Sequence, residues 1–449
     1  MKRTIALACC CLVLTTGLSA FQGPANAASW KTTEAAGTKA AREAHFDEAE
    51  KLLSVNLALA ENIARTMPKD DRLPASLFDL AQVYRAEGKY SLAFPLYERA
   101  LNIYQDHYGP DAPPVADVLE GEAELYKSLN DYAHAEPLLL QALAIRQKVA
   151  PPVDADIAQS KNDLGELYTA TAAYDKAEPL LVEALAIRQK ALPPDSPEIA
   201  ETQQALGNLY QKTTHPKEAE AAFRSAVSIY GKTVGGEHPD YANALESLAL
   251  CYEARKDYAS AEPLLLRVLA IRQAAFGDNH RDVAVSYENL AALRRAQHNN
   301  GEAVAYYQRA IATWEKVIGP DAPDIAGDLN NLGAIYEFSD QKPKAEPLFL
   351  RAIALDEKNY GPESPEVGTD LNNLGLLYSL LKRYDESDKA FRRALAIRIK
   401  TYGDQDPAVA ETMMSYATVL FALHRPEEAN QMDKKARAVL SHQSVTVQR

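Results

Sequence analysis

Cysteine is almost absent from this sequence. The 449 residues contain four cysteines, and Cys9, Cys10 and Cys11 lie together near the N-terminus. The fourth, Cys251, stands alone between Leu250 and Tyr252 in an apolar stretch, where a small core residue is expected. No disulfide can form within the chain beyond residue 11, so the fold must be held together by packing.

The sequence also lacks the short motifs that mark common catalytic and cofactor sites. It contains no HExxH, CxxC, GxSxG or P-loop motif, and no GxGxxG after a predicted strand. The nine histidines are scattered, and His238 and His280 lie in loop sequences that suit turn or cap residues. We therefore expect a protein that is not an enzyme, with no catalytic residues, no metal and no cofactor.

Long apolar runs are missing except at the N-terminus. Lys2 and Arg3 precede an uncharged run from Ile5 to about Ala20, which is short for a bilayer span. Ala25-Asn26-Ala27 then places small residues at the −3 and −1 positions of a signal-peptidase site. These features predict a secretory signal over residues 1–27, cleaved near Ala27, and an exported protein that is periplasmic or secreted. A retained membrane anchor is the alternative, but we expect no stable membrane insertion.

Basic residues are in the minority, with 48 Lys and Arg against 62 Asp and Glu, and the formal net charge is −14. An acidic chain is repelled by phosphate backbones and anionic lipid surfaces. This charge balance disfavours nucleic acid and membranes as partners. The absence of any Asn-x-Ser/Thr sequon makes a bacterial envelope the easier location for an exported chain.

What the sequence does have is a repeat with a period of 42 residues. The phrase AEPLLLQALAIRQK at 135–148 returns as AEPLLVEALAIRQK at 177–190 and as AEPLLLRVLAIRQA at 261–274. A period of this length is typical of a stack of small helical units. The first residue of the phrase recurs in strict register as Ala93, Ala135, Ala177, Ala219, Ala261, Ala303, Ala345, Ser387 and Ala429.

Each repeat is predicted to form two amphipathic helices joined by a short polar turn. In residues 365–381, for example, Leu371, Leu374, Leu377 and Tyr378 recur at spacings of three and four, which gives one apolar face. Loops such as YGPESP close the repeats. Glycine allows a left-handed helix exit there, and proline can begin the next helix.

An arginine recurs near the end of the second helix in several repeats. Arg146, Arg188, Arg272 and Arg398 share this register, and we expect them in the last helical turn. A cation in the last turn is favoured by the helix dipole by about 0.3–1 kcal/mol. A structural role is the favoured interpretation, and a row of arginine binding sites stays open as the alternative.

The pattern Leu–Gly/Ala–x–x–Tyr, followed by Tyr/Phe–x–x–Ala and by Ala within RALAI, resembles the tetratricopeptide repeat (TPR). Its 42-residue form, with LNNLG and AEPLLL phrases, resembles the kinesin-light-chain class of these repeats. The resemblance implies an all-α fold, a right-handed α-solenoid (superhelix) of about ten helix-turn-helix units. A degenerate unit or cap is expected over 28–72, nine units over 73–441 and a flexible tail over 442–449. Such arrays serve unrelated processes, so the pattern is specific for fold and not for function.

Helical geometry places a set of acidic side chains on the face of the first helices that would line a concave groove. These charges predict a groove that attracts a partner with a basic segment. The alternative is that an acidic protein carries solvated charge wherever it is not packed. The predicted acidic groove consists of Asp117, Glu120, Glu124, Asp163, Glu166, Glu201, Glu246 and Glu288.

Farther along the chain the same face carries amides and apolar side chains. An amide offers a donor and an acceptor, so it can pair with the backbone of an extended peptide whatever the peptide's sequence. In kinesin light chains, groove asparagines in LNNLA phrases hold the cargo peptide. The resemblance implies that role for Asn330, Asn331, Asn372 and Asn373, and more weakly for Asn289.

The alternative for these asparagines is structural bonding between neighbouring helices, which weighs equally for the second asparagine of each pair. Phe338 and Leu376 are expected to act as apolar anchors in the same peptide-binding groove. Arg295, in the one repeat that departs from the pattern, points into the predicted groove. It could receive a carboxylate of the partner or pair with a neighbouring glutamate.

Together these features predict a non-catalytic protein–protein interaction scaffold in the cell envelope or outside. We expect it to bind an extended peptide or protein segment in its concave groove. A carbohydrate- or small-ligand-binding envelope protein is the alternative, although the predicted groove shows few of the aromatic platforms that such a site needs. Self-association through the ends of the array stays open.

Overall fold

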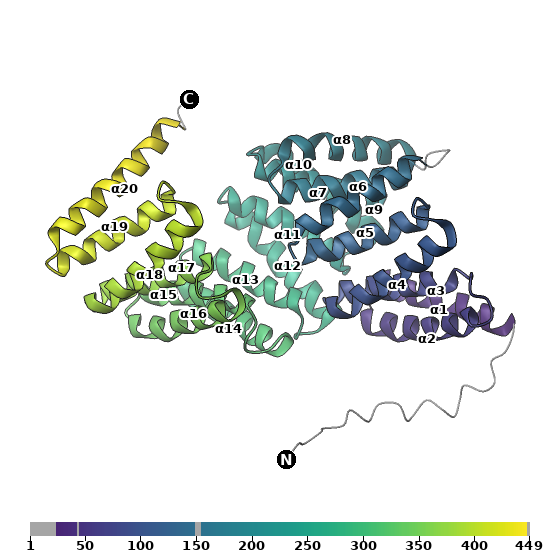
Figure 1. Cartoon of the computed structure of the whole chain (residues 1–449), viewed down its shortest axis with the longest axis horizontal. Coiled ribbons are helices and arrows are strands. Elements are labelled where there is room, and N and C mark those ends of the chain that lie inside the picture. The colour runs from purple at the N-terminus through teal and green to yellow at the C-terminus, as the bar shows by residue number, and fades with distance from the viewer. Residues whose placement is uncertain (1–23, 43–44, 149–153, 447–449) are drawn as a thin grey trace, which may run out of the picture. The chain divides into compact units, whose positions relative to one another are not determined.

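The computed structural model describes residues 24–42, 45–148 and 154–446 (Figure 1). The predicted secretory signal falls mainly on residues 1–23, which lie outside the described residues. Every regular element within the described part of the chain is helical, so the predicted all-α fold is confirmed.

The first helices of the successive pairs are α1 (Pro24–Arg42), α3 (Arg72–Ala86), α5 (Pro113–Ser128), α7 (Asp154–Ala170), α9 (Pro197–Lys212), α11 (Pro239–Ala254), α13 (Arg281–Ala296), α15 (Asp324–Glu337), α17 (Pro365–Leu380) and α19 (Pro407–Ala422). The second helices are α2 (Phe46–Ala64), α4 (Tyr90–Tyr108), α6 (Tyr132–Lys148), α8 (Tyr174–Ala191), α10 (Pro216–Thr233), α12 (Tyr258–Phe276), α14 (Asn300–Val317), α16 (Ala345–Tyr360), α18 (Tyr384–Tyr402) and α20 (Pro426–Thr446). A short 3₁₀ helix, η1 (Lys342–Lys344), precedes α16. None of these described helices is both long and apolar enough to cross a bilayer.

The chain forms two compact units, residues 1–251 and residues 252–449. In the first unit each first helix packs against the second helix that follows it, and that second helix packs against the next first helix, from α1 to α10. The same succession runs from α12 to α20 in the second unit. Each unit is therefore a stack of helix pairs, as in a solenoid.

Turn chemistry separates one pair from the next as the sequence predicts. Gly109 follows α4 with φ at 87°. This backbone conformation is unfavourable for any residue that has a side chain. Pro113 then begins α5. Gly361 and Pro365 repeat the arrangement between α16 and α17. Proline is tolerated at a helix start because its missing N–H would have no partner there.

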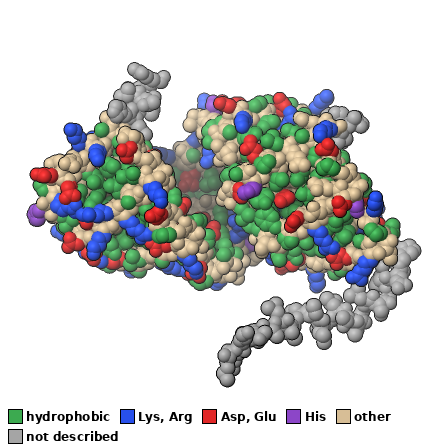
Figure 2. All heavy atoms as spheres, in the orientation of Figure 1, with side chains coloured by type: hydrophobic (Ala, Val, Ile, Leu, Met, Phe, Trp, Pro, Cys, Tyr) green, Lys and Arg blue, Asp and Glu red, His purple; other side chains and the backbone are tan. Residues whose placement is uncertain are grey.

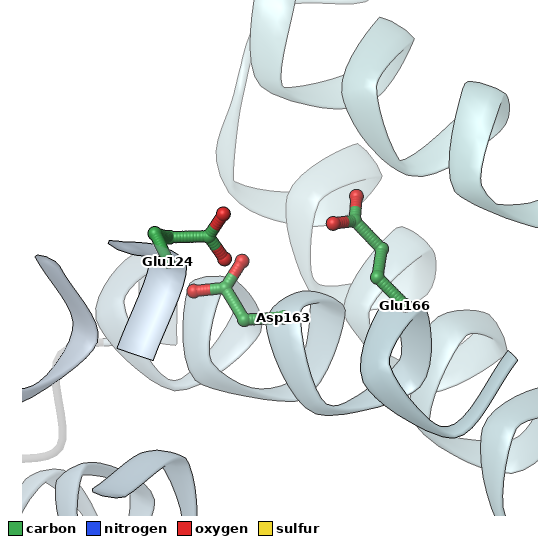
Figure 3. Close-up of side chains that lie close together, drawn as sticks. All are labelled: Glu124, Asp163 and Glu166. Carbon is green, nitrogen blue, oxygen red and sulfur yellow. The ribbon is translucent and has the colours of Figure 1, made fainter. Parts of the chain in front are cut away.

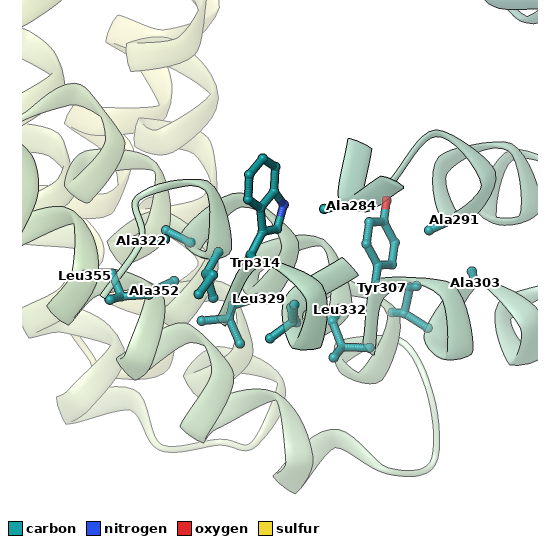
Figure 4. Close-up of a cluster of buried hydrophobic side chains, with 14 residues drawn as sticks. Ala284, Ala291, Ala303, Tyr307, Trp314, Ala322, Leu329, Leu332, Ala352 and Leu355 are labelled. Atoms are coloured by element: carbon teal, nitrogen blue, oxygen red, sulfur yellow. The ribbon is translucent and has the colours of Figure 1, made fainter. Parts of the chain in front are cut away.

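The core runs through the stack as a series of small clusters. In the second unit, Trp314 and Tyr307 are each only 2% exposed and lie among alanine, leucine and isoleucine side chains of α13 to α16 (Figure 4). Small residues let the helices of a pair approach closely. A Cβ atom added at Gly333 on α15 would lie 2.6 Å from Cε1 of Phe349 on α16, which is closer than real contacts allow.

The recurring arginines bind the next repeat. Arg188 is 2% exposed, and its Nη1 donates to the backbone oxygen of Glu198 at 2.6 Å and to Oγ1 of Thr202 at 2.6 Å. The same pattern, a carbonyl ten residues on and a hydroxyl fourteen residues on, holds at the other three arginines. Its members are Arg146 with Asp156 and Ser160, Arg272 with Asp282 and Ser286, and Arg398 with Ala408 and Thr412.

These bonds identify the physical reason for the repeated arginine. The expectation that all four lie in the last helical turn is wrong for Arg272 and Arg398, which precede the last turns of α12 and α18. Bridging to the next first helix, rather than the helix dipole, is what the four positions share.

Candidate functional site: an acidic cavity in the first unit

A cavity of about 490 Å³ opens on the first helices of four consecutive repeats in the first unit. Helices α3, α5, α7 and α9 contribute most of its lining, and α6 contributes Arg146. Six of the eight predicted acidic residues meet there, and we call this site the acidic cavity. Its lining is Phe78, Gln82, Arg85, Asp117, Glu120, Gly121, Glu124, Arg146, Gln159, Asp163, Glu166 and Glu201.

The acidic cavity contains more negatively charged side chains than positively charged ones, unlike the face of the first unit that Figure 2 shows. On the face of the first unit shown in Figure 2, acidic and basic side chains are interspersed among apolar ones. In the acidic cavity, six carboxyl groups are accompanied by two arginines, Arg85 and Arg146. The helical face therefore gathers negative charge where the side chains surround a hollow.

Three carboxyl groups form the centre of the site. Glu124 on α5 and Asp163 and Glu166 on α7 each place an oxygen within 4.8 Å of the others (Figure 3). The ammonium group of Lys127 donates to Glu124 at 2.6 Å and to Glu166 at 2.9 Å. Burial lowers the pKa of Lys127, but Glu166 and Glu124 raise it by more, so the pKa lies above its usual value.

Asp163 is the most deeply buried of the three, with 4% of its surface exposed. Its Oδ1 accepts a hydrogen bond from Nε2 of Gln159 at 2.8 Å. Burial, together with the negative charge of Glu124, raises the pKa of Asp163 well above its usual range. Burial also raises the pKa of Glu201, on α9.

Glu120 lines the cavity beside Arg146, one of the arginines that link successive repeats. Its carboxyl group is 2.6 Å from Nη2 of Arg146, which also donates to Asp117 at 2.9 Å. Burial raises the pKa of Glu120 to about 7 in spite of this partner. Burial thus disfavours the ionised forms of Glu120, Asp163 and Glu201, and an entering cation would stabilise those forms.

Carboxylate oxygens are ligands that Mg²⁺ and Ca²⁺ accept, so Glu124, Asp163 and Glu166 are the residues that could hold a metal. The Lys127 ammonium already bonds to two of the three, and a metal ion would have to displace it. The carboxyl groups therefore suit an organic cation, which donates hydrogen bonds to their oxygens and needs no complete coordination shell.

Two predicted acidic residues do not join the cavity. Glu246 lies on α11 of the first unit, outside the cavity lining. Glu288 lies on α13 of the second unit and accepts a hydrogen bond from Nε1 of Trp314 at 2.5 Å. Glu288 is therefore hydrogen-bonded to a residue of the core cluster of α13 to α16.

The asparagines of the second unit bond between neighbouring first helices. Asn330 on α15 donates to Oδ1 of Asp370 on α17, and its own Oδ1 accepts from Asn373 at 3.0 Å. Asn331 accepts from Nη1 of Arg295 at 3.0 Å. Asn330, to which the resemblance assigns a peptide-binding role, therefore uses both its amide nitrogen and its amide oxygen in bonds within the protein.

The remaining predicted groove residues differ in how far they reach solvent. Phe338, which follows the last residue of α15, is 78% exposed. Leu376 is half-buried and packs against the core cluster of α18 to α20. Asn289 on α13 is half-buried, and Asn372 donates to Asn373 at 3.5 Å. Phe338 is thus the residue of this set that presents a large apolar surface.

The sequence reasoning missed Arg146 and Gln159 as parts of this site. Arg146 lines the cavity while it bonds to Ser160, and Gln159 bonds to Asp163. The signal in the sequence was the register, since a serine or threonine stands fourteen residues after each of the four arginines.

Comparison with protein families identifies the repeat. The model of the tetratricopeptide repeat matches residues 72–148, 156–232, 217–274, 240–316, 282–358, 343–397 and 366–441. The chain belongs to the tetratricopeptide repeat family. Its repeats are similar to those of the kinesin-light-chain type, the resemblance that their phrases predict. A search of curated protein sequences gave no match.

Several solved TPR structures are similar to this chain. The Rap protein complexed with Competence and Sporulation Factor has a TM-score of 0.56 and 14% identity, covering 87% of this chain and 100% of its own. The apo form of the quorum sensor NprR from B. thuringiensis has a TM-score of 0.56 and 11% identity, covering 82% and 98%. The nearly identical TPR-like repeats of a protein named as a kinesin light chain of Podosopora anserina have a TM-score of 0.42 and 25% identity, covering 46% and 98%. At these identities the first two likenesses show the fold alone.

Proposed function

We propose that this TPR protein is a non-catalytic interaction scaffold that binds an extended, basic segment of a peptide or protein partner in the acidic cavity of its first unit. TPR arrays generally serve as protein–protein interaction scaffolds. Binding of a basic segment in the acidic cavity is supported by one observation: six carboxyl groups from three first helices line this cavity of about 490 Å³.

A basic side chain is the ligand group that matches this charge. Asp163 and Glu120 are 4% and 7% exposed, so little water screens them from a cation in the cavity. A guanidinium or ammonium group would donate to carboxylate oxygens, and charge-assisted bonds of this kind are roughly twice as strong as neutral ones. An anionic partner would meet repulsion at the same site.

A related fold accepts a ligand. The Rap protein, whose fold resembles that of this chain, is crystallised with Competence and Sporulation Factor. This likeness supports ligand binding by a TPR array. It carries no information about the chemistry of a ligand of this chain, which we infer from the residues of the acidic cavity.

In the second unit we propose a weaker contact at Phe338. Its ring is 78% exposed and would gain by packing against an apolar side chain of the partner. The predicted backbone-holding role of the asparagines requires a partner to compete with the bonds of Asn330 to Asp370 and Asn373. We further propose that the protein acts after export, because residues 1–27 have the pattern of a secretory signal.

A peptide-library selection tests the proposed ligand class. The chain from Ala28 onward would be immobilised at low salt beside a variant with Asp163→Asn and Glu166→Gln, and beside Glu246→Gln as the matched control. We expect enrichment of Arg- and Lys-containing peptides on the wild type and on Glu246→Gln, and loss of that enrichment on the cavity variant. Enrichment of peptides without basic residues, or equal selection by all three proteins, would refute the proposal.

A further inference from the structure

The seam between α16 and α17 differs from the four seams that have the arginine pattern, because it carries two carboxyl groups at the same positions. At four seams between successive repeats, an arginine on the second helix bonds to a serine or threonine on the next first helix. Forty-two residues before Arg398 and Thr412, the same two positions are Asp356 and Asp370. One cation and one hydroxyl are replaced by two carboxyl groups.

Both aspartates are buried. Asp356 is 5% exposed and Asp370 is 2% exposed, and their carboxyl groups face each other within hydrogen-bonding range. Oδ1 of Asp370 accepts from Asn330, whereas Oδ2 is buried and has no donor among the described residues. Two carboxyl groups can bond to each other only if one of them carries a proton.

Among the described residues, no basic side chain bonds to either aspartate to replace that proton. On α17, Glu366 adds negative charge near both aspartates. From α15 the neighbour is the neutral Asn330. Arg398 on α18 donates to Ala408 and Thr412 at the following seam and to Thr369 on α17. Neither aspartate is among these partners.

We propose that the Asp356–Asp370 pair is a proton-dependent contact, in which one shared proton holds α16 against α17 and its loss loosens this seam of the second unit. The aspartate pair is also linked to the asparagines of the predicted groove. Asp370 holds Asn330, which in turn accepts from Asn373. Loosening the seam would release the amides that the sequence predicts to bind a peptide backbone.

The direction of the pH dependence follows from the titration of the pair. Burial raises the pKa of Asp370 to about 8 and that of Asp356 to about 6, both above the usual value of an aspartate. The folded seam therefore keeps a proton that the unfolded chain releases near pH 4. Its stability is complete below that pH and is lost as the pH rises towards about 8.

Hydrogen exchange of the full chain, followed by mass spectrometry between pH 6 and 8.5 and corrected for intrinsic exchange rates, tests this. We expect peptides from residues 345–380 to lose protection by up to about tenfold per pH unit, which is the limit for release of one proton. Peptides from residues 384–422 contain the Arg398–Thr412 seam and serve as the internal control. They should lose less protection than residues 345–380.

Two variants make the test specific. Asp356→Arg with Asp370→Thr restores the pair found at the α18–α19 seam, and Asp370→Asn keeps the shape of the side chain but cannot ionise. Both variants should abolish the extra loss of protection in residues 345–380. If the double variant does not fold, the result for Asp370→Asn alone decides the test. A wild type whose two seams respond alike to pH, or an Asp370→Asn protein that responds like the wild type, would overturn the proposal.

Discussion

At the scale of single residues, one arginine position explains much of how the repeats join. A guanidinium group offers five donors in a rigid fork, so it can bond to a backbone carbonyl and a side-chain hydroxyl on the same helix. Arg188 also donates to Oε1 of Gln159 and lies 3.0 Å from Glu201, so it ties α8 to both α7 and α9. An ammonium group on a lysine could not span these partners with the same geometry.

Replacing this arginine should destabilise the first unit. We expect Arg188→Ala to lower the free energy of unfolding by about 2–4 kcal/mol, because the backbone oxygen of Glu198 and the buried hydroxyl of Thr202 lose their donor. Urea denaturation followed by circular dichroism measures the change. Lys190→Ala, two residues on at an exposed position of α8, is the control and should cost at most about 1 kcal/mol. Equal effects of the two changes would contradict the account.

The acidic cavity predicts a conflict between stability and binding at Asp163. Its pKa is raised by burial, so the folded state resists ionisation and the wild type loses stability as the pH rises above the value for an unfolded aspartate. Asp163→Asn should therefore stabilise the protein, and by more at pH 8 than at pH 5. Denaturation at the two pH values checks this. A variant less stable than the wild type at pH 8 would show that Asp163 is ionised and well paired in the fold.

At the scale of helices, glycine decides how closely the two members of a pair approach. Two glycines of α15 offer a matched comparison. A Cβ atom at Gly333 would collide with Phe349, whereas one at Gly327 would meet nothing within 4 Å.

We expect Gly333→Ala to destabilise the second unit by about 1–3 kcal/mol through overpacking. Gly327→Ala should be neutral or stabilising by up to about 1 kcal/mol, because alanine favours the helix. Thermal unfolding of the two variants beside the wild type gives the comparison. A larger loss at Gly327 than at Gly333 would refute the packing argument.

The helices and their boundaries could be predicted from sequence because the signals are local. Apolar periodicity, the Gly and Pro loops and the 42-residue register all act within one repeat. Burial at the groove face was not predictable, because it depends on first helices that are about 40 residues apart in sequence. Helical geometry placed Asp163 and Glu246 on equivalent faces, yet the fold buries Asp163 in the cavity and leaves Glu246 outside its lining.

The same limit applies to the asparagines and to the two aspartates of the α16–α17 seam. The resemblance to kinesin light chains implied that Asn330 faces a ligand, whereas its amide is bonded to Asp370 and Asn373. No local pattern signals that Asp370 is 2% exposed. Its register with Thr412 was the available clue, because a charged residue stands where a hydroxyl is expected.

At the scale of the whole molecule, the formal charge of −14 and the acidic cavity act in the same direction on a basic partner. We expect the dissociation constant of such a partner to rise by about tenfold between 50 and 300 mM NaCl, because salt screens charges beyond a few ångströms. Titrations at several salt concentrations measure this. A dissociation constant that does not change with salt would mean that apolar contacts, such as one at Phe338, dominate binding.

The most direct test of the central claim is a fluorescence anisotropy titration at 50 mM NaCl with two labelled peptides, four repeats of Ala-Arg and four repeats of Ala-Glu. The proteins are the wild type, the Asp163→Asn and Glu166→Gln cavity variant, and Glu246→Gln. We predict that the wild type and Glu246→Gln bind the arginine peptide and not the glutamate peptide. The cavity variant should bind the arginine peptide at least about tenfold more weakly, because it lacks two of the carboxyl groups that the ligand meets. Equal binding of the two peptides by the wild type, or of the arginine peptide by all three proteins, would contradict a basic ligand in the acidic cavity.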